Sequence, residues 1–193
     1  MLPYTTPTEL TDFNRLPEIL ALRHLCWQMH SKNDLRSTAD NADVLDFQST
    51  HFVSLNLSGE IIAANRVTLL HDLSELPYYP LMNRHLYPDG PFIYFSKLVI
   101  HPSYRKQGLK EHLDKARTAF LAGQQVAYGL GFYGDHRTID AIGQGFVSIE
   151  MISEGTEHIY PYEKRHLHVM TLPNHKTTTL EKNDLLESDL EEI

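Results

Sequence analysis

Residues 94–120 read YFSKLVIHPSYRKQGLKEHLDKARTAF, and they predict a strand, a tight basic loop and an amphipathic helix in succession. In the loop, Gly108 has no side chain, so a ligand can approach the main chain closely. Consecutive backbone N–H groups of such a loop, together with the positive end of the helix dipole, favour an anion such as pyrophosphate. The helix carries one apolar stripe with spacings of four, three and four residues, formed by Leu109, Leu113, Ala116 and Phe120.

The segment LVIHPSYRKQGLK resembles the coenzyme A loop of the GNAT superfamily of acyl-CoA N-acyltransferases, whose usual pattern is Arg/Gln-x-x-Gly-x-Gly/Ala. Arg105 and Gly108 hold the first two defined positions, and Lys110 stands where the family usually has Gly or Ala. The resemblance implies acetyl-CoA or another acyl-CoA as co-substrate. From the loop alone, the alternative is a surface turn that caps an ordinary helix. The coenzyme A contacts that the resemblance implies are Leu98, Val99, Ile100, Arg105, Lys106, Gln107, Gly108, Leu109 and Lys110.

Periodic segments outside the loop agree with the same superfamily over residues 15–172. They predict a mixed, mainly antiparallel central sheet flanked by helices, an α/β fold in a single domain. An extended lead-in over residues 1–14 precedes this domain, and an acidic tail over 173–193 follows it. The expected helices are 16–29 and 136–144, and the expected strands are a hairpin of 51–57 and 60–70, then 125–133, 146–152 and 167–172.

A narrower resemblance points to the acyl-homoserine lactone synthase branch. That branch usually has a carboxylate where this chain has Tyr94, and it generally lacks so clear a coenzyme A loop, which favours an acyl-CoA donor over an acyl carrier protein. We expect Arg66 and Asp46 to bind the substrate; the alternatives are a structural ion pair between them, or capping by Asp46 and Asp43. The residues that carry this resemblance are Arg23, Trp27, Asp43, Asp46, Arg66, Ser96 and Lys97.

The reaction that the GNAT resemblance implies is attack of an amine on a thioester. Backbone N–H groups of residues 97–100 are the expected donors to the oxyanion, and a bulge there would free them. The catalytic candidates are Tyr94, which would orient a water, and His101, which would accept the proton. Glu60 and Asp140 are alternative proton acceptors.

Composition excludes several other classes of protein. The chain has 193 residues, which fits one domain, and a net charge of −8 with scattered basic residues, so nucleic-acid binding is not expected. A basic loop in an acidic protein favours one small anionic ligand. No leader pattern and no long apolar run is present, so we expect a cytoplasmic protein that does not bind membranes. The expected partner is a small-molecule amine, and a homodimer is left open.

Other notable residues have plainer interpretations. Cys26, the lone cysteine, lies on the apolar side of the first predicted helix and is expected to be buried and inert. His166 and His168 share a strand face, but no third ligand stands at a matching offset, so no metal site is expected. The Pro-rich insert over 71–91 is either a wall or lid for a substrate or a cover for a sheet edge.

Three hypotheses stay open. The first is an acyl-CoA-dependent N-acyltransferase that moves an acyl group, expected to be acetyl, to a small amine or amino acid. The second is a non-catalytic acyl-CoA-binding or sensing domain, because Tyr94 replaces the usual base and Ala141 stands where the family usually has a Tyr acid. The third is a relative of the acyl-homoserine lactone synthases, which should prefer a longer acyl chain and S-adenosylmethionine.

Overall fold

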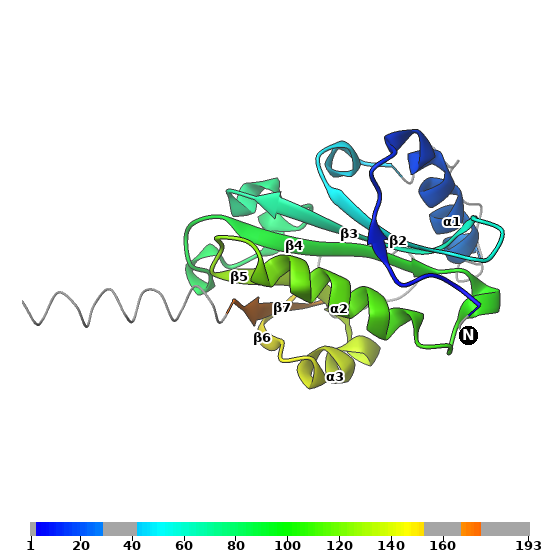
Figure 1. Ribbon diagram of the computed structural model, residues 1–193. Coiled ribbons are helices and arrows are strands. Elements are labelled where there is room, and N and C mark those ends of the chain that lie inside the picture. The colour runs from blue at the N-terminus through cyan, green and yellow to red at the C-terminus, as the bar shows by residue number, and fades with distance from the viewer. Residues whose placement is uncertain (1–2, 29–41, 153–166, 175–193) are drawn as a thin grey trace, which may run out of the picture. The chain divides into compact units, whose positions relative to one another are not determined.

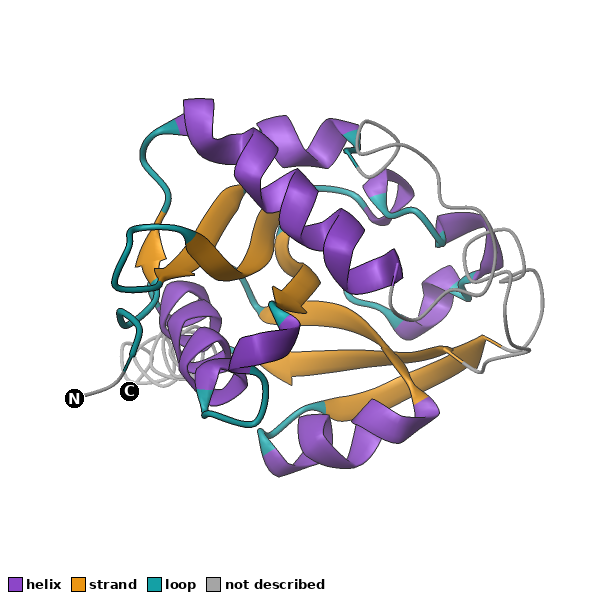
Figure 2. Ribbon diagram, turned by 90° about the vertical axis from the view of Figure 1, so that its right-hand side faces the viewer, coloured by secondary structure: helices purple, strands orange, loops and turns teal. Residues whose placement is uncertain are grey.

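The structure is a computed structural model, and it describes residues 3–28, 42–152 and 167–174. Short 3-10 turns occur in several connections (Figure 2). The strands are β1 (Thr8–Glu9), β2 (Thr50–Leu55), β3 (Ile61–Leu70), β4 (Phe92–Ile100), β5 (Tyr128–Gly134), β6 (Val147–Ile152) and β7 (Leu167–Pro173), and the helices are α1 (Leu16–Gln28), α2 (Leu109–Ala122) and α3 (Asp135–Gly143).

Seven strands form one sheet in the order β1-β2-β3-β4-β5-β7-β6 (Figure 1). The pairs β1–β2, β2–β3, β5–β7 and β6–β7 are antiparallel. The predicted mixed, mainly antiparallel sheet with flanking helices is therefore confirmed. Contacts divide the chain into two compact units: unit 1 comprises Met1–Thr68 and Phe95–Ala119, and unit 2 comprises Leu69–Tyr94 and Phe120–Ile193.

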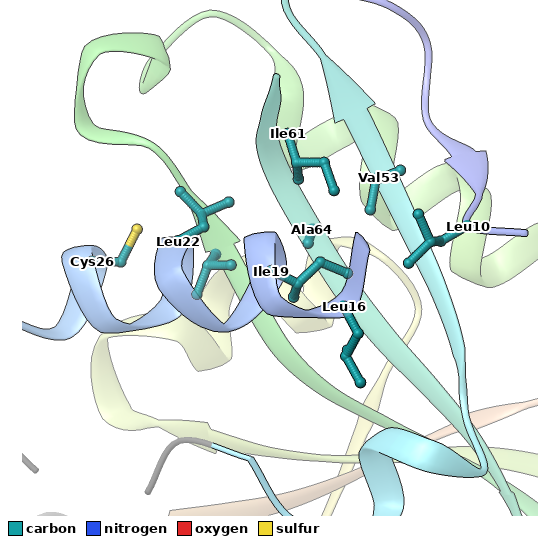
Figure 3. Close-up of a cluster of buried hydrophobic side chains, with 9 residues drawn as sticks. Leu10, Leu16, Ile19, Leu22, Cys26, Val53, Ile61 and Ala64 are labelled. Carbon is teal, nitrogen blue, oxygen red and sulfur yellow. The ribbon is translucent and has the colours of Figure 1, made fainter. Parts of the chain in front are cut away.

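In unit 1, α1 packs one side against β2, β3 and β4. Figure 3 shows Leu16, Ile19, Leu22 and Cys26 on that side, facing the strands. Cys26 is buried, as its place in the sequence predicted. A second cluster joins α2 to β3, because Leu109 and Leu113 pack with Ile62, Ala63 and Tyr4.

The predicted hairpin is formed by β2 and β3, with Thr50 opposite Val67. The turn between the strands is longer than predicted, because β2 ends at residue 55 instead of 57 and β3 begins at residue 61 instead of 60. Asn56 accounts for the difference, since its side-chain oxygen accepts the N–H groups of Ser58 and Glu60 and holds this stretch as a turn. Gly59, at φ +82°, completes the turn.

In unit 2, β5 begins at Tyr128, three residues later than predicted. Asn174 explains the delay, because its side-chain amide donates hydrogen bonds to the carbonyls of Leu121, Gln124 and Val126. Those carbonyls are held by a side chain, so the segment before Tyr128 forms a tight connection after α2. Of the expected tail over 173–193, Pro173 belongs instead to β7 and Asn174 is buried, whereas residues 175–193 lie outside the described residues, as does His166.

The insert over residues 71–91 forms the 3-10 turns η4 (Leu73–Glu75), η5 (Tyr79–Leu81) and η6 (Arg84–Leu86). Tyr78 packs edge-on against Phe132 of β5, with ring centroids 4.5 Å apart. Tyr87 donates a hydrogen bond of 2.7 Å to Glu150 of β6. Burial and Glu150 both raise the pKa of Tyr87, so its hydroxyl remains a donor. The insert thus covers strands of unit 2, and a lid function stays a prediction.

Candidate active site

The loop between β4 and α2 has the backbone that an anion cradle requires. After β4, the turn η7 (Pro102–Tyr104) leads to Lys106 at φ +61° and Gly108 at φ +87°. Left-handed residues at alternate positions turn neighbouring N–H groups toward one side, and α2 begins directly afterwards. The first N–H groups of a helix have no partner within it, so the loop and helix together present donors to an anion.

Side chains of the loop brace its main chain. Arg105 Nε donates to the carbonyl of Ile100 at 3.2 Å, and Gln107 Nε2 donates to the carbonyl of Ser103 at 3.0 Å. Cys26 Sγ lies 3.2 Å from the same Ile100 oxygen, and burial raises the pKa of its thiol. These side-chain hydrogen bonds are made within the protein, to Ile100 and Ser103, and leave the main chain to face outward.

Lys110 departs from the family pattern, and the structure gives its side chain a defined place. Its ammonium lies 3.2 Å from Asp114 Oδ2, one turn along α2. Asp114 also pairs with Arg117 at 2.9 Å. The side chain of Lys110 therefore extends along the helix toward a buried carboxylate.

Within β4, Lys97 has φ +55°, which is uncommon for a residue with a side chain. The regular pleat of β4 is therefore interrupted at Lys97, where the sequence predicted donors to an oxyanion. Residues 92–95 on one side of this point are buried, whereas Ser96, Lys97 and Leu98 are partly exposed.

A buried ion network occupies another part of unit 1. Arg23 Nη1 lies 2.8 and 2.9 Å from the two carboxylate oxygens of Asp46. Arg66 Nη1 lies 3.0 Å from Asp46 Oδ1, and Arg66 Nε donates to Ser96 Oγ at 2.9 Å. All three charged side chains are at most 1% exposed. Asp46 is therefore the hub that pairs two arginines, and it has no surface for direct contact with a substrate.

The exposed edge of this network is formed by Asp43 and Lys97. Asp43 pairs with Arg66, and Lys97 Nζ lies 3.5 Å from Asp43 Oδ2. The same ammonium lies 5.0 Å from the ring centroid of Trp27, a cation–π distance. The side chains of Asp43 and Lys97 are 38% and 26% exposed. Asp43 and Asp46 also form the capping box of η3 (Val44–Phe47), so the capping alternative holds alongside the ion pairs.

Electrostatics in the network are unbalanced. Among the residues that the structure describes, Arg23, Arg66 and a protonated Lys97 face two carboxylates, which leaves one excess positive charge there. Arg23 Nε and Nη2 are buried and have no hydrogen-bond partner among the described residues. Unsatisfied buried donors and an excess positive charge both favour a bound anion.

Burial and neighbouring charges shift the protonation of this network. Burial raises the pKa of Asp46, but the charges of Arg23 and Arg66 and a backbone hydrogen bond at Asp43 outweigh it, so the pKa lies below its ordinary value. Burial lowers the pKa of Lys97. It also lowers the pKa of His51, whose Nε2 lies 2.9 Å from the carbonyl oxygen of Asp46. His51 is thus neutral at pH 7 and donates to that oxygen.

The two predicted catalytic residues have different surroundings. Tyr94 is buried in unit 2, and its ring packs edge-on against Phe132 at 5.8 Å. His101 belongs to unit 1, where Nδ1 accepts the backbone N–H of Ser103 at 3.3 Å and caps η7. That hydrogen bond occupies the lone pair of Nδ1, so in this tautomer Nε2 carries the proton.

The alternative acceptors lie in separate units. Glu60 is in the β2–β3 turn of unit 1, where Asn56 Nδ2 donates to it at 2.6 Å. Asp140 is in α3 of unit 2, and the adjacent Ala141 is 1% exposed.

Unit 1 brings together all seven residues of the narrower resemblance and the whole loop. Sequence reasoning missed two contributors. His51 gave no signal in a strand of alternating residues, whereas its position opposite Arg66 in the hairpin register could have indicated it. Tyr4 lies in the N-terminal lead-in and bonds to the loop.

Comparisons with known proteins identify the fold. The chain aligns with FeeM, an N-acyl amino acid synthase from uncultured soil microbes, at TM-score 0.66 and 11% identity, over 91% of this chain and 93% of that one. It aligns with a GCN5-related N-acetyltransferase from Kribbella flavida at TM-score 0.60 and 14% identity, over 89% and 98%. The fold is that of the GNAT N-acyltransferases.

A third structure, the NatC complex bound to Gag peptide and CoA, aligns at TM-score 0.60 and 10% identity, over 89% of this chain and 99% of that one. No protein-family model and no curated protein sequence matches the chain. Among its described residues, no helix has the length and apolar character to cross a membrane, and no group of three His, Cys, Asp or Glu is placed to hold a metal.

Proposed function

We propose that this chain is an acyl-CoA-dependent N-acyltransferase that moves an acyl group, expected to be acetyl, from coenzyme A to a small amine or amino acid. The observation that carries the proposal is the succession of β4, a loop with Lys106 and Gly108 in left-handed conformations, and the N-terminus of α2. The GNAT fold supports it.

On the donor side, backbone N–H groups of residues 106–110 would bind the pyrophosphate, assisted by the α2 dipole. The Arg105 N–H donates to the carbonyl of Pro102 and would hold the loop instead. Ile100 already accepts hydrogen bonds from Arg105 and Cys26, so the end of β4 is fixed relative to the loop. The side chain of Val99 is buried in the core, so Val99 would contact the donor through its main chain. Ile100 stands three positions after Lys97, roughly 10 Å along the strand.

In the reaction, the neutral amine attacks the thioester carbon, a C–N bond forms and the C–S bond breaks. N–H groups of β4 near Lys97 would stabilise the oxyanion; one such donor is typically worth about 3–4 kcal/mol in other enzymes. The proton of the incoming ammonium passes to a base before the attack. The second proton, which the nitrogen loses as the amide forms, passes through water to the departing coenzyme A thiolate. A thiolate is a fair leaving group, so the buried Ala141 in place of an acid is compatible with turnover.

For the base, we propose two groups that would act separately: Tyr94 would orient a water, or His101 would accept the proton. His101 would then have to release Nδ1 from Ser103 or exchange tautomers. His101→Asn is the matched test, because its amide oxygen can still accept the Ser103 N–H while its acid–base function is lost. A falling kcat with an unchanged melting temperature supports the assignment, and an unchanged kcat contradicts it.

For the acceptor, we propose binding at the exposed edge formed by Asp43 and Lys97. Asp43 can attract an ammonium, and the excess positive charge of the network favours an acceptor that also carries a carboxylate. This favours an amino acid over a simple amine. Arg66 and Asp46 would act indirectly, because both are buried and together they hold Asp43 in place.

The seven residues of the narrower resemblance all belong to unit 1. This favours a second candidate, an enzyme related to acyl-homoserine lactone synthases. Such an enzyme would use S-adenosylmethionine as acceptor and prefer a medium or long acyl chain. Comparing acetyl-CoA with longer acyl-CoAs, each with amino acids or with S-adenosylmethionine, separates it from the first.

The experiment that tests the proposal is an assay of thiol release from acyl-CoA in the presence of amines and amino acids. Release that depends on the acceptor supports the transferase. Binding of acyl-CoA without release with any acceptor would contradict it and leave a non-catalytic acyl-CoA sensor.

A further inference from the structure

The N-terminal segment of the chain lies beside the loop that joins β4 to α2 (Figure 1). We propose that Tyr4 is a positioning residue, whose hydroxyl group orients the Gln107–Gly108 peptide so that the Gly108 N–H faces the bound anion. This inference rests on the proposed function, because it assumes that the loop holds the pyrophosphate of coenzyme A.

Tyr4 is placed by β2 and not by the loop. Tyr4 forms an isolated antiparallel bridge with Asn56. At the next residue, Thr5 N donates to the carbonyl of Leu55 at 2.8 Å, and Leu55 N donates to Thr5 Oγ1 at 2.9 Å. β1 continues the pairing with β2. The main chain at Tyr4 is therefore held against the sheet independently of the loop.

The side chain of Tyr4 is held equally firmly. It is 5% exposed and packs with Ile62, Leu109 and Leu113, so the ring sits between β3 and the first turns of α2. Its ring centroid lies 6.0 Å from that of His112, one turn into α2. A ring fixed in this way presents its hydroxyl group at a defined point.

That hydroxyl group donates a hydrogen bond to the carbonyl oxygen of Gln107. The chain has no cis peptide bond among its described residues, and in a planar trans peptide the C=O and the following N–H point in opposite directions. With the Gln107 oxygen held toward Tyr4, the Gly108 N–H must point away from Tyr4. A Cβ at Gly108 would lie 3.6 Å from the Tyr4 oxygen, so the two groups are in contact distance.

The rest of the loop leaves this peptide as the point that needs an external support. Gln107 Nε2 ties the loop back to Ser103, and His112 N donates to the carbonyl of Gly108 at 3.2 Å. The Gln107–Gly108 peptide is the link between these two ties, and Lys106 and Gly108 next to it are both at positive φ. Rotation of the Gln107–Gly108 peptide would remove one donor from the cradle, and the bond from Tyr4 opposes that rotation.

The test compares wild type with Tyr4→Phe, which keeps the ring and removes the hydroxyl group, and with Thr5→Val as matched control. Thr5→Val removes a side-chain hydrogen bond from the same segment without touching the loop. Calorimetric titration measures the Kd of coenzyme A, and kinetics compares acyl-CoA with acyl-pantetheine, which lacks the pyrophosphate. Melting temperatures report folding.

We expect Tyr4→Phe to raise the Kd of coenzyme A about three- to tenfold, the loss of one hydrogen bond. We expect kcat/KM for acyl-pantetheine to match that of wild type, and Thr5→Val to bind coenzyme A like wild type. An unchanged Kd in Tyr4→Phe overturns the inference, as do equal losses with acyl-CoA and acyl-pantetheine or an equal loss in Thr5→Val. If wild type itself does not bind coenzyme A, the proposed function fails instead.

Discussion

Unit 1 contains two polar sites built in opposite ways. The β4–α2 loop is a main-chain site, in which two left-handed residues and a helix N-terminus aim N–H groups outward and side chains only brace them. The ion network is a side-chain site, in which Arg23, Asp46 and Arg66 lose almost all contact with solvent. Main-chain donors suit a ligand that is the same in every reaction, such as coenzyme A. Charged side chains can differ between enzymes, which suits recognition of a particular acceptor.

The largest effect we expect comes from breaking the network at its hub. Asp46→Asn leaves Arg23 and Arg66 without their shared carboxylate, and breaking a buried pair costs about 3–5 kcal/mol of unfolding free energy. Chemical denaturation measures the change. Glu18→Gln is the matched control: it removes the exposed pair with Arg15, for which we expect a cost below about 1 kcal/mol. Equal losses in the two variants would contradict the structural role of Asp46.

A comparable effect on binding, with little effect on folding, is expected in the loop. Gly108→Val places a branched side chain at φ +87° and disturbs the neighbouring N–H groups. Loss of two charge-assisted hydrogen bonds, about 1.5–3 kcal/mol each, should raise the Kd of coenzyme A at least a hundredfold. Gly59→Val, at φ +82° with no atom near the added Cβ, tests strain alone and should leave the Kd unchanged.

A smaller effect should distinguish binding of the acyl-CoA donor from binding of the amine acceptor. Lys97→Met removes the exposed cation of the network, so the KM for an amino-acid acceptor should rise about tenfold, roughly 1.4 kcal/mol. The KM for acyl-CoA and the KM for an amine without a carboxylate should stay the same. A parallel rise in all three would show that Lys97 acts through the strand and not through acceptor charge.

The smallest effect is on the pH dependence of stability. Burial lowers the pKa of His51 in the folded state, so below about 6.5, the ordinary value, the unfolded state binds one more proton. Stability from this group is therefore present above that pH and is lost as the pH falls below it. His51→Gln, whose amide can still donate to Asp46, should lose correspondingly less over the same interval. Identical pH profiles for the two proteins would contradict a neutral His51.

The two sites also differ in how far the sequence predicted them. The loop is contiguous, so Gly108 and the stripe of α2 predicted its place and its neighbours. The network joins Arg23, Asp46 and Arg66 from separate elements, and only resemblance suggested that they belong together. Sequence could not distinguish a buried Asp46 from an exposed one, because packing of α1 on the strands decides it.

Two further contacts could not be predicted from sequence patterns, for a related reason. Tyr4 lies in a short segment without periodicity, and Asn174 caps the end of α2 from the far end of β7. Both depend on which distant chain segments meet in the folded protein. Periodicity and motifs report local structure, whereas such long-range hydrogen bonds follow from topology.

The most direct test of the central claim, that the β4–α2 loop binds coenzyme A, is a thermal-shift titration of the protein with coenzyme A, acetyl-CoA and longer acyl-CoAs, alongside Gly108→Val. A ligand bound only to the folded state, at a hundred times its Kd, stabilises it by about 2.7 kcal/mol. We predict a concentration-dependent rise in the melting temperature of wild type and none in the variant. No rise with any of these ligands, or an equal rise in the variant, would contradict the account.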